Sequence, residues 1–132
     1  MNVLLSIKPK YVNEIINGNK RYEFRKVIFR NRNITTVYIY SSSPEKQIVG
    51  SFEIGDIIED HPHNLWEKFK DQSGIEETEF FRYFGGRDKG FAIEIEKLNR
   101  FEHPIDPKEL ILGFVPPQSF CYVDVPLEAE DM

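Results

Sequence analysis

The sequence has little of what staples or anchors small proteins. Cys121 is the only cysteine among 132 residues, which excludes an internal disulfide and a zinc cage built from cysteines. A lone cysteine is most simply a reduced, small core residue, and it favours a cytoplasmic location. No apolar run reaches the length that spans a membrane. The segment Met1–Lys8 also lacks the basic start and the long apolar stretch of a signal peptide.

The composition that remains is that of one folded domain. Hydrophobic residues make up 40% of the chain and aromatic residues 14%, which is typical of a globular protein. A chain of this length buries roughly two thirds of its unfolded surface, so neither a disulfide nor a metal is required for folding. We therefore expect a single domain over residues 1–132, with an acidic end (about 124–132) that frays.

Charge is distributed unevenly along the chain, whose net charge is −5. Residues 1–50 hold nine Lys/Arg and three Asp/Glu, a balance of +6. Residues 51–132 hold eight Lys/Arg and nineteen Asp/Glu, a balance of −11. A basic segment within an acidic chain suits a local anion-binding face. This interpretation requires that the fold does not intermix the two halves.

Hydrophobic periodicity predicts alternating groups of strands and short helices. Gly50 is expected to allow a bulge or a close backbone approach, and Gly55 to turn the chain. The expected strands are 3–7, 20–26, 36–40, 47–54, 91–96 and 120–123, and the expected helices are 9–17, 64–70, 76–84 and 106–109. This order predicts the α+β class, as a small, mostly antiparallel β-barrel with several short flanking helices.

One stretch, Gly18–Arg25, combines a helix stop with a charged strand. In a strand, successive side chains point to opposite faces, so Arg21, Glu23 and Arg25 would share one face. Arginine suits planar recognition of phosphate or carboxylate. The alternative is an exposed ladder of ion pairs, which contributes little. Strict alternation would place Lys20 on the other face, unless it lies at the turn before the strand begins.

This stretch resembles the signature of the ASCH domain (activating signal cointegrator homology), a branch of the PUA-like β-barrel superfamily. The pattern G-x-K-x-x-E-x-R is met by Gly18, Lys20, Glu23 and Arg25. Flanking segments agree as well, and the resemblance spans about residues 3–123: Leu5–Pro9, Tyr38–Pro44, Val49–Phe52 and Pro116–Phe120.

The resemblance implies a basic cleft beside the first helix that binds RNA or a nucleotide, with a regulatory role. Basic side chains would contact phosphates, while a tyrosine ring and serine hydroxyls would contact a base. The candidate ligand contacts are Lys8, Lys20, Arg21, Glu23, Arg25, Arg30, Arg32, Tyr40, Ser41 and Ser42.

An enzyme using the same cleft is the main alternative, because some proteins that resemble this one hydrolyse RNA or acetylcytidine. The amidohydrolase branch has a threonine at this position. This chain has Glu23 instead, so it lacks a hydroxyl nucleophile there. A single-strand ribonuclease would need a base, a cation and correct positioning, and Lys20, Glu23 and Arg25 are the catalytic candidates in that case. Glu23 could equally orient Lys20 or Arg25. A third alternative is a protein-interaction accessory domain.

Metal and cofactor chemistry finds little support in the sequence. His61 and His63 stand beside acidic residues, but without cysteines or a further nearby histidine they fit a solvated loop better than a metal site. We expect no metal site and no cofactor. The expected partner is RNA, a nucleotide or a nucleoside, with no membrane association, and no feature identifies a protein partner.

Overall fold

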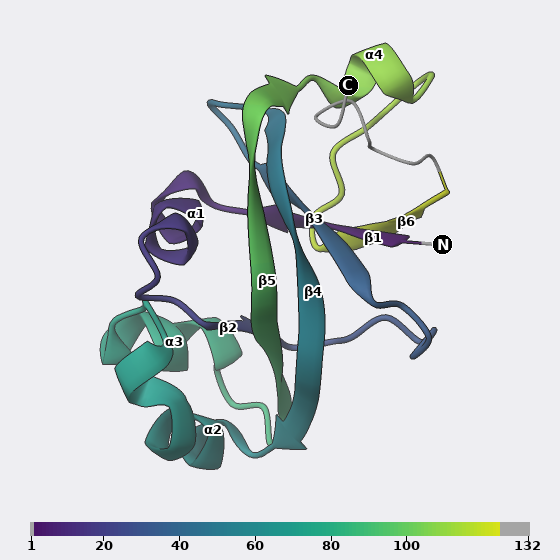
Figure 1. Ribbon diagram of the computed structural model, residues 1–132. Helices are drawn as coiled ribbons and strands as arrows, with labels where there is room; N and C mark the ends of the chain where they lie inside the picture. Colours follow the sequence, from purple (N-terminus) through teal and green to yellow (C-terminus); the bar gives the residue numbers. More distant parts are fainter. Residues whose placement is uncertain (1, 125–132) are drawn as a thin grey trace.

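The protein is described by a computed structural model, which covers residues 2–124. Six strands and four α-helices follow one another in the order shown in Figure 1, with a short 3-10 helix between α2 and α3. The predicted fraying of residues 124–132 lies almost wholly outside the described residues. The elements are β1 (Asn2–Ile7), α1 (Pro9–Ile16), β2 (Tyr22–Arg25), β3 (Thr36–Ser41), β4 (Gln47–Asp60), α2 (Pro62–Phe69), η1 (Lys70–Gln72), α3 (Glu77–Phe84), β5 (Gly90–Ile105), α4 (Pro107–Leu110) and β6 (Phe120–Val123).

All six strands belong to one mixed sheet in the order β2-β5-β4-β3-β1-β6. Among the described residues, only β1 and β3 pair in parallel, and the other four pairings are antiparallel. The α+β class and the mostly antiparallel sheet are therefore confirmed. Within residues 2–124 no strand pairing joins β2 to β6, so closure into a barrel stays a prediction.

Strand β4 is longer than the strand predicted from the sequence. The turn expected at Gly55 is wrong, because β4 runs unbroken from Gln47 to Asp60. A register shift between Ile54 and Ile57 accommodates the glycine within the ladder. The close approach expected at Gly50 is confirmed, since a Cβ there would lie 2.7 Å from the Asn99 carbonyl oxygen.

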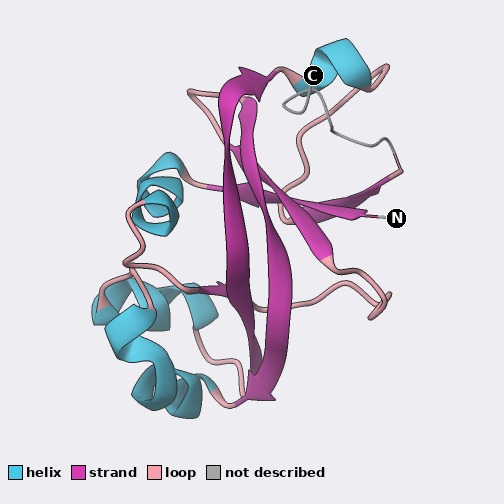
Figure 2. Cartoon of the chain, viewed as in Figure 1, coloured by secondary structure: helices cyan, strands magenta, loops and turns pink. Residues whose placement is uncertain are grey.

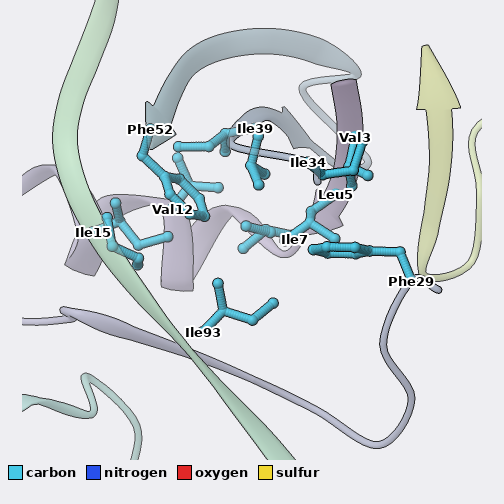
Figure 3. Close-up of a cluster of buried hydrophobic side chains, with 12 residues drawn as sticks. Val3, Leu5, Ile7, Val12, Ile15, Phe29, Ile34, Ile39, Phe52 and Ile93 are labelled. Carbon is cyan, nitrogen blue, oxygen red and sulfur yellow. The ribbon is translucent and has the colours of Figure 1, made fainter. Parts of the chain in front are cut away.

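Helices cover the sheet unevenly, as Figure 2 shows. Helices α1, α2 and α3 gather on one side of the long strands β4 and β5, whereas α4 lies near one end of them. Figure 3 shows the main core, in which α1 contributes Val12 and Ile15 against strand side chains such as Leu5 and Ile39.

A second apolar cluster holds α2 and α3 in place. Phe80 and Phe84 on α3 are almost fully buried and pack with Leu65, Trp66 and Phe24. The aromatic stripe of α3 is therefore part of the core, as is usual for apolar residues at helical spacing. Beside this packed face, Glu79 of α3 contacts Tyr11 of α1, and the candidate site lies between these two helices.

Candidate functional site

A cavity of about 640 Å³ lies between α1, α3 and the ends of β1, β2 and β3. It is lined by six of the residues predicted from the sequence as ligand contacts: Lys8, Lys20, Glu23, Arg25, Tyr40 and Ser42. Apolar and aromatic walls separate these polar groups, among them Ile7, Phe24, Ile75, Phe80 and Pro116. A concave, mostly apolar space with a few convergent polar groups is typical of a ligand site.

Lys20 lies at the turn before β2 rather than within the strand. Gly18 ends α1 with a positive φ of 83°, and Lys20 then forms an isolated bridge with Ser73. Because β2 begins only at Tyr22, the pleat does not impose alternation on Lys20. Its side chain therefore reaches the same cavity as Glu23 and Arg25.

The Lys20 ammonium is almost completely removed from solvent, with 3% of the residue exposed. Its Nζ donates to the Ser73 carbonyl oxygen at 2.8 Å and lies 3.6 Å from Glu23 Oε1. The rings of Phe24 and Tyr11 lie 4.9 and 5.5 Å from Nζ, within the range of cation–π attraction. Burial lowers the pKa of Lys20 below its ordinary value, and the Glu23 carboxylate partly opposes that shift.

Glu23 and Arg25 form a buried ion pair beside Lys20. Arg25 donates to Glu23 Oε2 through Nη2 at 2.7 Å and through Nε at 3.0 Å. The same guanidinium donates to the Ser6 carbonyl at 3.0 Å and to the carbonyl and hydroxyl oxygens of Ser119 at 3.3 Å. Arg25 is thus committed to protein partners, and Glu23 holds Lys20 and Arg25 together. This geometry favours an orienting role for Glu23 over an acid–base role.

Arg25 also joins segments from opposite ends of the sheet. It lies at the end of β2, while Ser6 belongs to β1 and Ser119 directly precedes β6. The order β2-β5-β4-β3-β1-β6 places β2 at one end of the sheet, and β6 with its neighbour β1 at the other. A side chain can bridge them only if the sheet curves strongly.

A polar contact between α1 and α3 lies beside the cavity. Tyr11 donates its hydroxyl hydrogen to Glu79 Oε2, and Lys10 Nζ lies 2.9 Å from Glu79 Oε1. Burial, followed by this hydrogen bond, raises the pKa of the Tyr11 phenol. We call these three side chains the α1–α3 latch. Sequence reasoning missed it, because nothing in the helix pattern pairs residues 68 or 69 positions apart.

Exposed cations surround the cavity on several elements. Lys8 precedes α1, Lys46 lies in the turn between β3 and β4, and Arg82 belongs to α3. Lys46 has a positive φ of 56°, a rare backbone conformation for a residue with a side chain. Lys46 and Arg82 were also missed, although Lys46 lies two residues after the Tyr38–Pro44 segment that resembled the ASCH pattern. Glu79 lies among these cations, so the two charge halves are partly intermixed.

Four other predicted ligand contacts lie outside the cavity. Arg21 is exposed on a shallower depression between the end of α1 and residues 70–76. Arg30 and Arg32 are exposed in the loop after β2, where the Arg30 backbone N–H donates to the Tyr122 hydroxyl at 3.0 Å. Ser41 is fully buried and does not line the cavity. Arg21 diverges because it precedes the strand, so it does not share the face of Glu23 and Arg25.

Tyr40 lines the cavity in a different way from the exposed stacking ring that was expected. It is 2% exposed, and its ring centroid lies 5.6 Å from that of Phe114. Burial raises the pKa of its phenol. Its ring therefore packs in the core and is not free to stack on a base as an exposed ring would be.

The histidine pair is part of a helix cap. His61 precedes α2, and its Nδ1 accepts from the His63 backbone N–H at 3.1 Å. Among residues 2–124, no group of three His, Cys, Asp or Glu side chains is arranged to hold a metal ion. No helix in the same range is long and apolar enough to cross a membrane.

These observations define an α+β domain with a buried lysine in a cavity between two helices. The chain belongs to the ASCH domain family, and the family model described as a domain of unknown function (DUF365) matches residues 1–114. This chain is 28% identical to the ASCH domain-containing ribonuclease of Zymomonas mobilis over 126 residues. The match covers 91% of this chain and 82% of that protein.

Solved structures agree with this assignment. The crystal structure of ASCH from Zymomonas mobilis superposes with a TM-score of 0.85 at 25% identity, covering 92% of this chain and 87% of that one. The N-terminal domain of Staphylothermus marinus McrB shares the fold, with a TM-score of 0.55 at 14% identity and coverage of 85% and 81%. The chain is also 28% identical to the large ribosomal subunit protein uL22 of Ureaplasma parvum over 108 residues, 81% of this chain but 34% of that protein.

Proposed function

We propose that this protein binds single-stranded RNA, with one nucleotide unit entering the cavity between α1 and α3. The observation that carries the proposal is the buried Lys20 ammonium, whose Nζ is held by Ser73 and Glu23 beside open space. A largely desolvated cation interacts strongly with an acceptor or an anion that replaces water. The cations Lys8, Lys46 and Arg82 are placed to contact flanking phosphates.

The test of binding is an affinity measurement at low salt with a labelled single-stranded RNA. Lys20→Met removes the ammonium and keeps most of the side-chain volume, so we expect affinity to fall by about tenfold or more, as for a lost hydrogen bond to a charged group. Lys89→Met is the matched control, because Lys89 is 65% exposed, pairs with Glu59 and does not line the cavity. Equal affinities of the two variants would reject the proposal.

A second candidate function, cleavage of the bound RNA, is supported by the position of Lys20 in the cavity beside Glu23, where burial lowers its pKa. A neutral amine can accept the proton of the ribose 2′-hydroxyl. The 2′-oxygen then attacks phosphorus, the bond to the 5′-oxygen breaks, and the leaving oxygen takes up a proton. The products are a 2′,3′-cyclic phosphate and a 5′-hydroxyl. The similarity to a protein named a ribonuclease adds weight to this candidate.

Product analysis tests the cleavage candidate separately from binding. Wild-type protein should convert RNA to fragments with cyclic phosphate ends, whereas RNA with 2′-O-methyl groups should bind and remain intact. Lys20→Met should abolish cleavage. Glu23→Gln should reduce cleavage more than binding, because it removes the charge that orients Lys20. Binding without any cleavage of unmodified RNA would leave the protein a binding module and reject the enzyme.

We also propose that the sheet closes into a PUA-like barrel. The bridge from Arg25 to Ser6 and Ser119 supports strong curvature that brings β2 near β1 and β6. Arg25→Met should therefore loosen both the sheet ends and the cavity. Amide hydrogen exchange that is unchanged in β2 and β6 of this variant would argue against such closure.

A further inference from the structure

The segment that enters α3 is attached to the Lys20 turn by three contacts. The Lys20 backbone forms a bridge with Ser73, and the Arg21 N–H donates to the Gln72 carbonyl at 2.8 Å. The Lys20 ammonium donates to the Ser73 carbonyl at 2.8 Å. Both the backbone and the side-chain end of Lys20 are thus held by one short segment that lies more than fifty residues further along the chain.

Gly74 allows this close approach. A Cβ at Gly74 would lie 2.4 Å from Lys20 Cβ and 3.0 Å from its Cα and Cγ. These atoms belong to the root of the lysine side chain, so a clash there cannot be relieved by moving a flexible end. Gly74 also has a positive φ of 61°, which glycine adopts without steric cost.

The Ser73 side chain fixes the shape of the same turn. Its Oγ lies 2.8 Å from the Lys70 carbonyl and 3.2 Å from the Ile75 carbonyl, and the residue is 1% exposed. These contacts hold the peptide group whose carbonyl accepts from Lys20. The turn then leads into α3, which contributes Glu79 and Arg82 to the opposite wall of the cavity.

We propose that the turn formed by Ser73 and Gly74 is a positioning element of the cavity, which determines where the Lys20 ammonium stands and links it to α3. Neither residue needs to touch the RNA. Gly74 lets the turn approach Lys20, Ser73 shapes the turn, and its carbonyl anchors the ammonium in the desolvated position. The expected effect on RNA affinity rests on the proposed function, but the expected effect on the titration of Lys20 does not.

The experiment compares Gly74→Ala with Gly85→Ala. Gly85 has nearly the same positive φ, 60°, but a Cβ there would meet nothing within 4 Å. Both variants place a Cβ on a residue with positive φ, so each carries backbone strain, but only Gly74→Ala also pushes against Lys20. We expect the lysine Nζ or Cε resonance of Lys20 to titrate closer to the ordinary value of 10.5 in Gly74→Ala, and to be unchanged in Gly85→Ala. Affinity for single-stranded RNA should fall about tenfold in Gly74→Ala only.

Ser73→Ala keeps the inference testable if Gly74→Ala does not fold. This variant removes the two hydroxyl contacts without adding volume, and it should move the Lys20 titration in the same direction by a smaller amount. A Lys20 titration identical to wild type in every folded variant of the turn would overturn the inference. If Lys20→Met binds RNA as well as wild type while the Lys20 titration still depends on Gly74, the proposed function fails and the positioning role stands.

Discussion

Glu23 stands between two buried cations, and its removal tests whether the pair holds the site together. Glu23→Gln keeps the shape of the side chain but leaves Arg25 and Lys20 without a carboxylate in a region where all three residues are at most 7% exposed. We expect the free energy of unfolding to fall by about 3 kcal/mol or more, measured by urea denaturation.

The matched control for Glu23→Gln is an exposed ion pair. Lys68→Met removes the salt bridge to Asp60. The Lys68 side chain is 55% exposed and that of Asp60 is 28% exposed, and ion pairs of this kind contribute little to stability. This control should unfold at nearly the same urea concentration as wild type. If Glu23→Gln unfolds at the same urea concentration as the control, the buried triad of Lys20, Glu23 and Arg25 does not stabilise the fold.

Lys20 should give the protein a specific dependence of stability on pH. Its folded pKa is lowered by burial from 10.5, so between the two pKa values the unfolded chain binds more protons than the folded chain. Stability attributable to this group therefore rises with pH from the lowered pKa towards 10.5 and is smallest below that window. Urea unfolding of wild type and Lys20→Met at a series of alkaline pH values measures the difference, in which the other groups cancel. A difference independent of pH would contradict the burial of a charged amine.

At the scale of secondary-structure elements, the α1–α3 latch makes a titration prediction. The Glu79 carboxylate accepts a hydrogen bond from Tyr11 and places negative charge near its phenol. Glu79→Gln removes this carboxylate and its charge. The pKa of Tyr11 should then fall towards the ordinary value of 10.0, although burial keeps it raised. The late step of tyrosine ionisation that belongs to Tyr11, followed by ultraviolet absorbance, should therefore move to lower pH in the variant than in wild type. Tyr11→Phe is the control that removes this step altogether.

Elements whose residues face one core were predictable, and elements joined by remote contacts were not. Alternation and helical spacing located most strands and helices, since burial of one face imposes the period. The turn expected at Gly55 failed because a glycine within a long antiparallel pair can be absorbed by a bulge. The position of Lys20 was open in the sequence, and its bridge to Ser73 settles it. Local pattern carries no information on that partner.

At the scale of the whole molecule, the site is an assembly of distant segments. Lys20, Glu23 and Arg25 come from one motif, which is why the sequence could point to them. Glu79 and Arg82 come from α3, and their contribution depends on the burial of the Phe80 face of that helix. An amphipathic stripe predicts which face of α3 is buried, but not which element its other face meets. The opposite wall of the cavity was therefore beyond sequence reasoning.

With a net charge of −5, the RNA binding that we propose would depend on local rather than overall charge, and salt dependence tests this. The cavity cations Lys8, Lys46 and Arg82 are exposed, and in the proposed function each contacts a phosphate. For single strands, the logarithm of affinity falls with that of salt concentration by roughly 0.7 per contact. Replacing all three by methionine should therefore make the slope less steep by about 2.

The matched control for this salt experiment removes the same charge elsewhere. Lys89, Lys97 and Lys108 are exposed and do not line the cavity, so their triple methionine variant should keep the wild-type slope. A Debye length of about 8 Å at physiological ionic strength screens such distant charges from the ligand. Equal slopes for the two triple variants would mean that RNA is attracted by the summed field of the protein. In that case the cavity cations would have no special part in phosphate recognition, and the proposed path of the strand would be wrong.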